Sequence, residues 1–590
     1  MRRQLLAAGL ILALLAGCGP VRTEPVDQEA APADEPVIAY VPLDDRPDNE
    51  ERVVYLANSL GYALHMPERN DYRTALDGQP LNENGTQYGD RAALYEWVLA
   101  QETAGCDRYI LSVDQLLSGG LVSSRSMTGE QPVTLSDGRT VTEAELLAEL
   151  IEVLAADENN QVWLLDTVMR LAATTGYGGF GLNEYNALRT YGMAARPHLT
   201  GAELTVESIV ADYPLGADGQ PIRVEAEEPL PEGAVENYLA SRERKLRLSD
   251  GLFDDLRDTQ GQFHVLIGID DSSEEDSIQK NEIAYLRSRL REGDALLSGV
   301  DDLAFKAVAK LYLQESGWAG AAASVQYFGG TEDQPACAYD YQPLTVIMEE
   351  HFDFFGLRLS EEAELEILVL TQPADQAKAA EYYGALIQRL NANREVGMPT
   401  ILVDAGNGTY GTAFHEALTE RTELGWLLSY AGFLDMAIVT GTALSHGVAR
   451  YAFLQVGQQT EAAERAFLRT VADSILKDFC YKNVVRNDIL EFVRGDLGGN
   501  ADNFWTPDID RAAVLARLES GMADATEDVI ANLERSNFIS ALEPYTERGW
   551  GGVELTDYRF PWDRAFEIGM DILLGDTTEP HRQMLGLYYQ

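Results

Sequence analysis

Short apolar runs that each end at an acidic residue recur along the chain. Four of them are rich in β-branched and large apolar residues, and a turn follows each one. They are Val37–Val41 before Asp44 and Asp45, 108–113 before Asp114, Phe263–Ile269 before Asp270 and Asp271, and 400–403 before Asp404. Runs of this length and composition predict buried β-strands.

Helical patterns separate these strands. Residues 50–61 and 91–102 read as amphipathic helices, and Thr142 with Glu145 forms a capping-box signature for a third helix. This alternation predicts an α/β protein with parallel sheets, built as Rossmann- or flavodoxin-like lobes with a mostly helical C-terminal part. A distorted (β/α)8 barrel is the alternative, because roughly eight strand candidates can be counted and acids at strand ends suit it as well.

The length of 590 residues exceeds what one hydrophobic core supports, since single cores stop growing at roughly 250–300 residues. We therefore expect an α/β lobe with the acid-bearing loops over 36–320 and a second α/β lobe over 321–460. Residues 461–590 are expected to form a helical region and a tail packed on the body.

The N-terminus predicts export and lipid anchoring. Two arginines after the initiator methionine precede an apolar run over 5–16, which is too short to span a bilayer. The run ends in Leu-Ala-Gly-Cys, which resembles the lipobox of bacterial lipoproteins, so residues 1–17 are read as a signal peptide and Cys18 as the lipidated residue. Residues 18–35 are rich in proline and acids and predict a disordered linker. The protein is thus expected to face outside the cytoplasm at the cell membrane or envelope, held only by its lipid.

The formal net charge of −51 argues against nucleic acid as a partner, because two polyanions repel each other. Beyond Cys18, the cysteines are Cys106, Cys337 and Cys480, an odd number without the spacing of a zinc knuckle or a disulfide framework. We expect them to be small core residues. The oligomeric state stays open.

Acids at the carboxyl ends of parallel strands predict one polar site, because ligands bind at that edge of an α/β sheet. The catalytic candidates are Asp44, Asp45, Asp114, Asp270 and Asp404. The candidates for substrate binding are Arg46, Arg125, Arg170, Asp271 and Asn407. Two carboxyl groups across a cleft, one protonated and one ionised, are what glycoside hydrolysis requires. The alternative for each acid is a structural ion pair that ties loops together.

Other chemistries lack their motifs. The sequence contains no HExxH, no GxSxG and no glycine-lysine-serine/threonine phosphate loop. No cofactor is expected, although an all-oxygen Ca²⁺ or Mg²⁺ site on the acids remains an alternative. The favoured hypothesis is a surface-anchored carbohydrate-active hydrolase that acts on a small-molecule or glycan substrate. The competing hypothesis is a non-catalytic lipoprotein that binds a glycan or solute.

Six segments carry a resemblance to one bacterial family, the domain of unknown function 4127. They are VPLDDRPDN at 41–49, LSVDQLLSGGLVSSR at 111–125, IGIDDS at 267–272, VDAGNG at 403–408, YAGFLD at 430–435 and FPWDRAFEI at 560–568. The resemblance implies one integrated unit whose acid-bearing loops belong together, and it implies no particular activity.

The chain departs from the family pattern in one place. Where the family is expected to read approximately GWNT followed by another Asn, this sequence has apolar Leu434 and Ile438. If those amides contact substrate in relatives, their replacement would change specificity or abolish activity.

Overall fold

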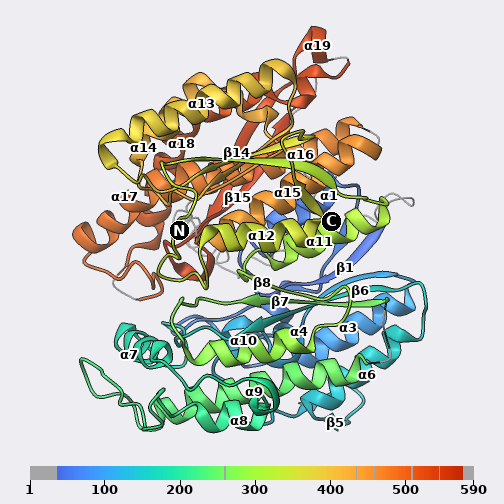
Figure 1. The fold of residues 1–590 in the computed structure, drawn as a ribbon, viewed down its shortest axis with the longest axis vertical. Helices are drawn as coiled ribbons and strands as arrows, with labels where there is room; N and C mark the ends of the chain where they lie inside the picture. The colour runs from blue at the N-terminus through green and yellow to red at the C-terminus, as the bar shows by residue number, and fades with distance from the viewer. Residues whose placement is uncertain are drawn as a thin grey trace, which may run out of the picture.

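Two parallel β-sheets with helices on their faces organise the chain (Figure 1). The computed structural model describes residues 36–575 except 258, 260, 433, 434, 458, 507, 508 and 544. The predicted signal peptide, the lipidation site Cys18 and the predicted linker lie outside the described residues. The prediction of an α/β protein with Rossmann-like parallel-sheet lobes is confirmed.

The first sheet has six parallel strands in the order β2-β1-β3-β6-β7-β8. They are β1 (Val37–Val41), β2 (Ala63–His65), β3 (Arg108–Ser112), β6 (Gln161–Val168), β7 (Phe263–Ile269) and β8 (Ala295–Ser298). The chain steps from β1 outward to β2 and then returns to the other side of β1 for β3. This reversal is a topological switch point, where the loops at the carboxyl ends diverge and leave room for a ligand.

The second sheet repeats this topology with five parallel strands in the order β10-β9-β11-β12-β13. They are β9 (Ala321–Phe328), β10 (Leu357–Leu359), β11 (Leu365–Leu370), β12 (Thr400–Asp404) and β13 (Ser429–Gly432). Both sheets are open, with separate edge strands, so the (β/α)8 alternative is wrong. Local hydrophobic runs do not show whether parallel strands close into one barrel or divide into two sheets. Both arrangements are therefore compatible with the sequence pattern.

A layer of helices lies between the two sheets and belongs to the core of both (Figure 1). It contains α1 (Glu51–Ser59), α11 (Leu303–Glu315), α12 (Leu344–Phe355) and α15 (Met436–Val456). One hydrophobic cluster joins Ile38 and Ile110 of the first sheet to Ile367 and Ile401 of the second. Helix α15 is apolar on nearly every side, as expected for a helix buried all round. Its Gly447 allows close approach, since a Cβ there would lie 2.4 Å from Ile401.

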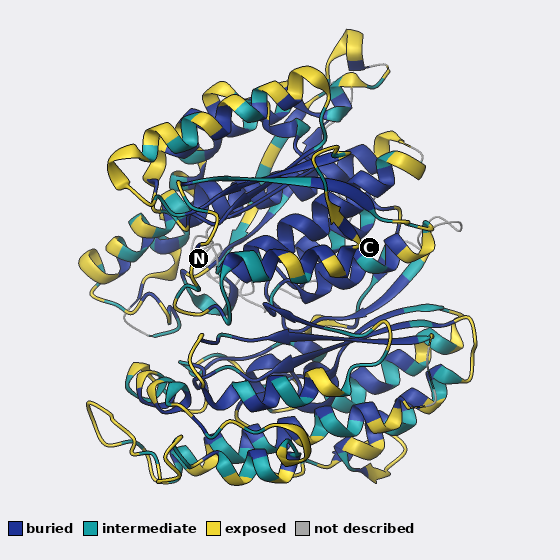
Figure 2. Ribbon diagram, in the orientation of Figure 1, coloured by how far each residue is buried: buried dark blue, intermediate teal, exposed yellow. Residues whose placement is uncertain are grey.

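Other helices cover the outer faces of the sheets, and their outward sides are exposed (Figure 2). Those on the first sheet include α3 (Arg91–Thr103), α4 (Val113–Ser118), α6 (Glu143–Ala155), α9 (Ala234–Asp255) and α10 (Ile278–Arg289), and those beyond the second include α13 (Ala379–Val396), α14 (Gly411–Arg421) and α18 (Arg511–Ser536). The predicted capping box at Thr142 is confirmed, because its hydroxyl accepts from the Glu145 amide at 3.1 Å and the Glu145 carboxylate accepts from the Thr142 amide at 2.8 Å.

Smaller elements fill the connections of the first sheet. They are α2 (Arg69–Tyr72), α5 (Leu121–Ser124), the hairpin β4 (Val133–Thr134) and β5 (Thr140–Val141), α7 (Leu182–Met193) and α8 (Val206–Asp212). In the described part of the chain no helix is both long and apolar enough to cross a membrane. Cys106, Cys337 and Cys480 are free thiols.

The C-terminal part is mostly helical and ends in an antiparallel strand pair. Its elements are α16 (Glu461–Ser474), the π-helix η4 (Ile475–Val485), α17 (Arg486–Glu491), the π-turn η5 (Phe492–Asp496), α18, α19 (Tyr545–Arg548), β14 (Gly552–Arg559) and β15 (Gly569–Gly575). The loop between β14 and β15 carries the sequence FPWDRAFEI. This pair brings that loop to the carboxyl end of β1, where the Trp562 indole donates to Asp45 at 2.8 Å.

Candidate functional site

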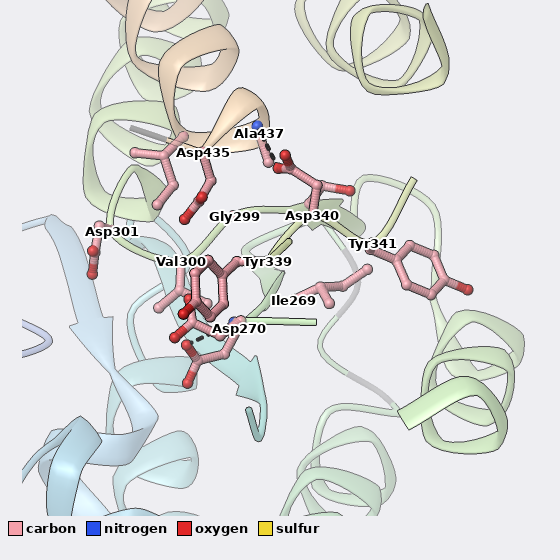
Figure 3. Close-up of a pocket in the computed structure, with 13 residues that line it drawn as sticks. Ile269, Asp270, Gly299, Val300, Asp301, Tyr339, Asp340, Tyr341, Asp435 and Ala437 are labelled. Carbon is pink, nitrogen blue, oxygen red and sulfur yellow. Dashed lines mark hydrogen bonds between the residues drawn. The ribbon is translucent and has the colours of Figure 1, made fainter. Parts of the chain in front are cut away.

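A small polar pocket lies where the carboxyl ends of both sheets meet (Figure 3). It has about 370 Å³ of empty space including its open mouth. Its lining residues are Ile269, Asp270, Asp271, Ser298, Gly299, Val300, Asp301, Tyr339, Asp340, Tyr341, Asp435, Ala437 and Ile438. Five of the thirteen are aspartates, so the pocket is suited to a polar ligand rather than an apolar one.

Four connections bring these aspartates together. Asp270 and Asp271 follow β7, Asp301 follows β8, Asp340 lies in the connection from β9 to α12, and Asp435 lies between β13 and α15. The strand-end pattern thus holds for both sheets. The pattern predicts Asp270 and Asp271 from the sequence, and it also applies to Asp301 after β8 and Asp435 after β13.

Arginines neutralise three of the pocket aspartates. Arg125 Nη2 lies 2.5 Å from Asp270 Oδ2, and Arg170 forms an ion pair with Asp271. Arg46 Nη2 lies 2.6 Å from Asp301 Oδ1 and 2.8 Å from Asp44 Oδ2. These ion pairs hold the three carboxyl groups in place at the pocket wall and offset their charge.

Asp435 has a different environment. It lies across the pocket from Asp270 (Figure 3), and among the described residues no side chain forms an ion pair or hydrogen bond with its carboxyl group. Burial raises the pKa of Asp435 to about 8, and the negative charges of Asp271, Asp340 and Asp301 add to the effect. At neutral pH this carboxyl group therefore holds its proton.

Asp340 fixes the position of Asp435. Its carboxylate accepts hydrogen bonds from the backbone amides of Met436 at 3.3 Å and Ala437 at 3.1 Å, at the start of α15. A carboxylate at the first turn of a helix satisfies free amides and complements the helix dipole. The loop after β9 is thereby tied to the helix whose first residues carry Asp435.

The Asp44-Asp45-Arg46 turn is connected to the pocket through Arg46, which pairs with the lining residue Asp301. Asp44 is fully buried and accepts from the Arg46 amide at 3.0 Å and from Asn49 at 2.9 Å. Burial raises the pKa of Asp44, and the adjacent Arg46 acts in the opposite direction. Asp45 accepts from the Thr74 amide at 3.1 Å as well as from Trp562. Neither aspartate lines the pocket. Asp44 orients Arg46, and Asp45 orients Trp562.

Asp114 lies in a separate buried ionic group. Its Oδ1 is 2.8 Å from Lys245 Nζ, which also pairs with Asp166, and its Oδ2 accepts from the Thr167 hydroxyl at 2.6 Å. Asp114 is 1% exposed and does not line the pocket. The arrangement matches the structural alternative, an ion pair that fastens α9 to the strand ends.

Replacement of Asp114 by asparagine is expected to lower the free energy of unfolding by about 1–3 kcal/mol, because a buried charge-assisted hydrogen bond is lost while Asp166 still neutralises Lys245. Urea denaturation of both proteins measures this difference. The exposed Asp488→Asn on α17 is the control, with an expected change below about 1 kcal/mol. Equal stability of Asp114→Asn and the wild type would contradict the structural role.

Asp404 and Asn407 lie at the carboxyl end of β12, also outside the pocket lining. The Tyr430 hydroxyl donates to Asp404 at 3.2 Å, and His415 Nε2 lies 3.6 Å from it. Burial lowers the pKa of His415, which favours the neutral ring. Asn407 is exposed and has φ of 45°, a conformation that asparagine tolerates in tight turns. The residues of the predicted single polar site thus fall into four groups, and only Asp270 and Asp271 among them line the pocket.

Sequence reasoning did not assign Glu567 and Arg564 to the site, although both belong to the FPWDRAFEI segment. Glu567 is buried, and its Oε1 lies 3.7 Å from Arg46 Nε. Burial raises the pKa of Glu567 to about 8, and repulsion from Asp48 contributes. The family-like ending was the only sequence signal, since these residues follow no strand of either parallel sheet.

Glu567 is expected to make the protein less stable as pH rises. Its pKa of about 8 in the folded protein exceeds the value of about 4.3 for an unfolded chain, so the folded state binds the extra proton between these values. The stabilisation is full below about pH 4 and is lost as pH rises through about 8. The free energy of unfolding of Glu567→Gln, taken relative to that of the wild type, should therefore rise by more than about 1 kcal/mol between about pH 5 and pH 9.

Urea denaturation at both pH values checks this expectation, and the exposed Glu527→Gln on α18 serves as the control. Parallel pH profiles for Glu567→Gln and the wild type would show that Glu567 is ionised throughout.

Within the described ranges, no group of three or more His, Cys, Asp or Glu side chains is arranged to hold a metal ion. Of the two positions where the sequence departs from the family pattern, Ile438 lines the pocket and Leu434 lies outside the described residues. Ile438, where the family pattern is expected to carry an amide, therefore contributes an apolar side chain to the pocket wall that also contains Asp435.

The fold and the pocket define a two-sheet α/β protein with an acid-lined site at the meeting carboxyl ends of its sheets. The chain belongs to the family described as "Protein of unknown function (DUF4127)", whose profile matches residues 38–571. Comparison with curated proteins and comparison with solved structures gave no match.

Proposed function

We propose that this protein is a hydrolase of the glycosidase type, with Asp435 as the general acid and Asp271 as its ionised partner. The observation that carries the proposal is the contrast between two aspartates of one pocket. Asp435 has no counter-ion among the described residues and its pKa is raised to about 8, whereas Asp271 forms an ion pair with Arg170. Two carboxyl groups with opposed environments are the usual assignment of acid and base or nucleophile.

The proposed roles follow from this contrast. Asp435 donates its proton to the oxygen of the leaving sugar, and Asp271 either activates water or attacks the anomeric carbon. Burial raises the pKa of Asp271, while Arg170 and Arg125 counteract that effect and favour its charged form. Because like charges in one site resist joint ionisation, the charge on Asp271 helps Asp435 to keep its proton.

The proposed location is outside the cytoplasm, on a lipid anchor at Cys18. The arginine pair, the apolar run and the Leu-Ala-Gly-Cys sequence at the N-terminus support it. An exported, tethered hydrolase would meet glycans of the envelope or the surroundings, which agrees with a polar pocket.

A substrate screen tests the proposal. The purified protein is assayed against a panel of nitrophenyl glycosides and cell-wall glycan fragments, and the anomer first released is determined by NMR. Turnover that is lost in Asp435→Asn and Asp271→Asn but kept in the exposed Asp488→Asn supports the glycosidase assignment. Binding of a glycan without turnover, equal in all four proteins, would instead place the protein among glycan-binding lipoproteins.

A further inference from the structure

Three arginines beside the pocket, Arg46, Arg125 and Arg564, are linked through two shared contacts. Arg46 and Arg564 lie against the same indole, with guanidinium carbons 5.0 and 5.5 Å from the centre of Trp562. Arg125 donates to the Thr174 hydroxyl at 3.2 Å, and Arg564 donates to the carbonyl of the next residue, Thr175. Arg46 and Arg125 in turn pair with Asp301 and Asp270, which line the pocket. Arg564 does not itself line the pocket, but both contacts link it to an arginine that pairs with a lining aspartate.

Arg564 differs from its neighbours in having no counter-ion. Arg46, Arg125 and Arg170 each pair with a carboxylate, whereas no carboxylate of the described residues forms an ion pair with Arg564. Its Nε is buried without a hydrogen-bond acceptor, and the same holds for the Nε atoms of Arg125 and Arg170. A buried cation without a partner is unfavourable, and a bound anion would offset that cost.

The backbone around Arg564 is held in a strained form. Trp562 and Asp563, the two residues before it, have φ of 54° and 53°, values that non-glycine residues seldom adopt. Hydrogen bonds keep the turn in place, from Trp562 to Asp45 at 2.8 Å and from Gln79 to Asp563 at 2.8 Å. Strain that the surrounding structure maintains in this way is typical of ligand sites.

The charge state of Arg564 fits an anion-binding role. Burial lowers the pKa of Arg564 to about 10, the negative charges of Asp502 and Glu567 oppose this effect, and the positive charges of Arg46 and Arg170 add to it. The side chain is still protonated at neutral pH. Because Arg46, Arg125 and Arg170 are each paired with a carboxylate, the positive charge that an anionic group would meet here is that of Arg564.

We propose that the substrate of this pocket is an acidic saccharide, whose carboxylate or phosphate group binds the guanidinium of Arg564. The inference rests on the proposed glycan hydrolase and names the substrate class. A guanidinium matches the planar, two-oxygen geometry of both anions. The net charge of −51 repels such a ligand at long range, but salt screens charges beyond about 8–10 Å, so the guanidinium of Arg564 can attract the anionic group at short range.

Calorimetric binding measurements on the full chain test the proposal. The probes are glucuronate, glucose 6-phosphate and neutral glucose, and the proteins are the wild type, Arg564→Gln, Arg564→Lys and the exposed control Arg517→Gln. Arg564→Gln is expected to weaken binding of an anionic probe by about 10–100-fold and to leave glucose binding unchanged. Arg564→Lys should restore part of the affinity, because it keeps the charge but loses the two-oxygen geometry. Comparison of glucuronate with glucose 6-phosphate separates the two anions.

Equal binding of glucose and the anions by the wild type, failure of both anions to bind, or an equal loss for all probes in Arg564→Gln would overturn the proposal. Asp435→Asn distinguishes it from the proposed reaction. If that variant and the wild type bind the anion through Arg564 and neither hydrolyses any glycoside, the hydrolase proposal fails and the anion site stands. If the wild type hydrolyses glycosides and Arg564→Gln hydrolyses a glucuronide and a neutral glucoside with the same KM and kcat as the wild type, the anion site fails and the hydrolase stands.

Discussion

Asp435→Asn is expected to lower kcat by about 10²–10⁴-fold on a glycan substrate, because asparagine cannot donate the proton that the leaving oxygen needs. The loss should shrink on dinitrophenyl glycosides, whose leaving groups depart without protonation. In the wild type, kcat/KM should fall as pH rises through about 8, the pKa at which Asp435 loses its proton. Steady-state kinetics on both substrate types across pH measure all three effects.

The control for this experiment is Asp488→Asn, which changes the same residue type in an exposed ion pair with Arg517. Its kcat should equal that of the wild type. If Asp435→Asn lost the same factor on activated and unactivated substrates, or kept the alkaline fall near pH 8, another residue would be the acid. Unchanged unfolding by urea in Asp435→Asn would show that any rate loss is chemical.

Arg52→Leu is expected to lower the free energy of unfolding by about 3–5 kcal/mol, the second large effect. Arg52 is 2% exposed and lies between three aspartates, at 3.1 Å from Asp48, 3.2 Å from Asp473 and 3.5 Å from Asp478. Burial alone would raise the pKa of Asp48, but Arg52 and nearby lysines hold it below its usual value. Leucine in its place would leave Asp48 without its ion-pair partner and Asp473 and Asp478 with only Lys477 and Lys482, which leaves buried negative charge in excess and is strongly unfavourable.

This ionic group joins α1 to α16 and the π-helix η4, so the loss should be cooperative and visible in both urea and thermal unfolding. Arg517→Leu, in an exposed pair, is the matched control and should change stability by less than about 1 kcal/mol. Equal stability of the two variants would mean that water reaches the ionic group around Arg52, so that its charges are not buried.

Strand positions and several site residues follow from local sequence. An apolar run of four to seven residues buries itself as a strand, and a break after it exposes the next polar residue at the sheet edge. This is why the sequence alone assigns Asp270 and Asp271 to a site, and why Asp301 and Asp435 obey the same pattern. The parallel-sheet α/β lobes, the capping box at Thr142 and membership of the family can also be predicted from the sequence, because each depends on neighbours in sequence or on short motifs.

The tertiary structure alone decided how many sheets form and which charges meet. Asp114, Asp270 and Asp435 look alike in sequence, each after a strand. Only the fold gives Asp114 a lysine, Asp270 an arginine and Asp435 no counter-ion among the described residues. The contact of Trp562 with Asp45 joins residues 517 positions apart. Ion pairs and hydrogen bonds depend on distances of a few ångströms between loops remote in the chain, and local periodicity carries no information about those distances.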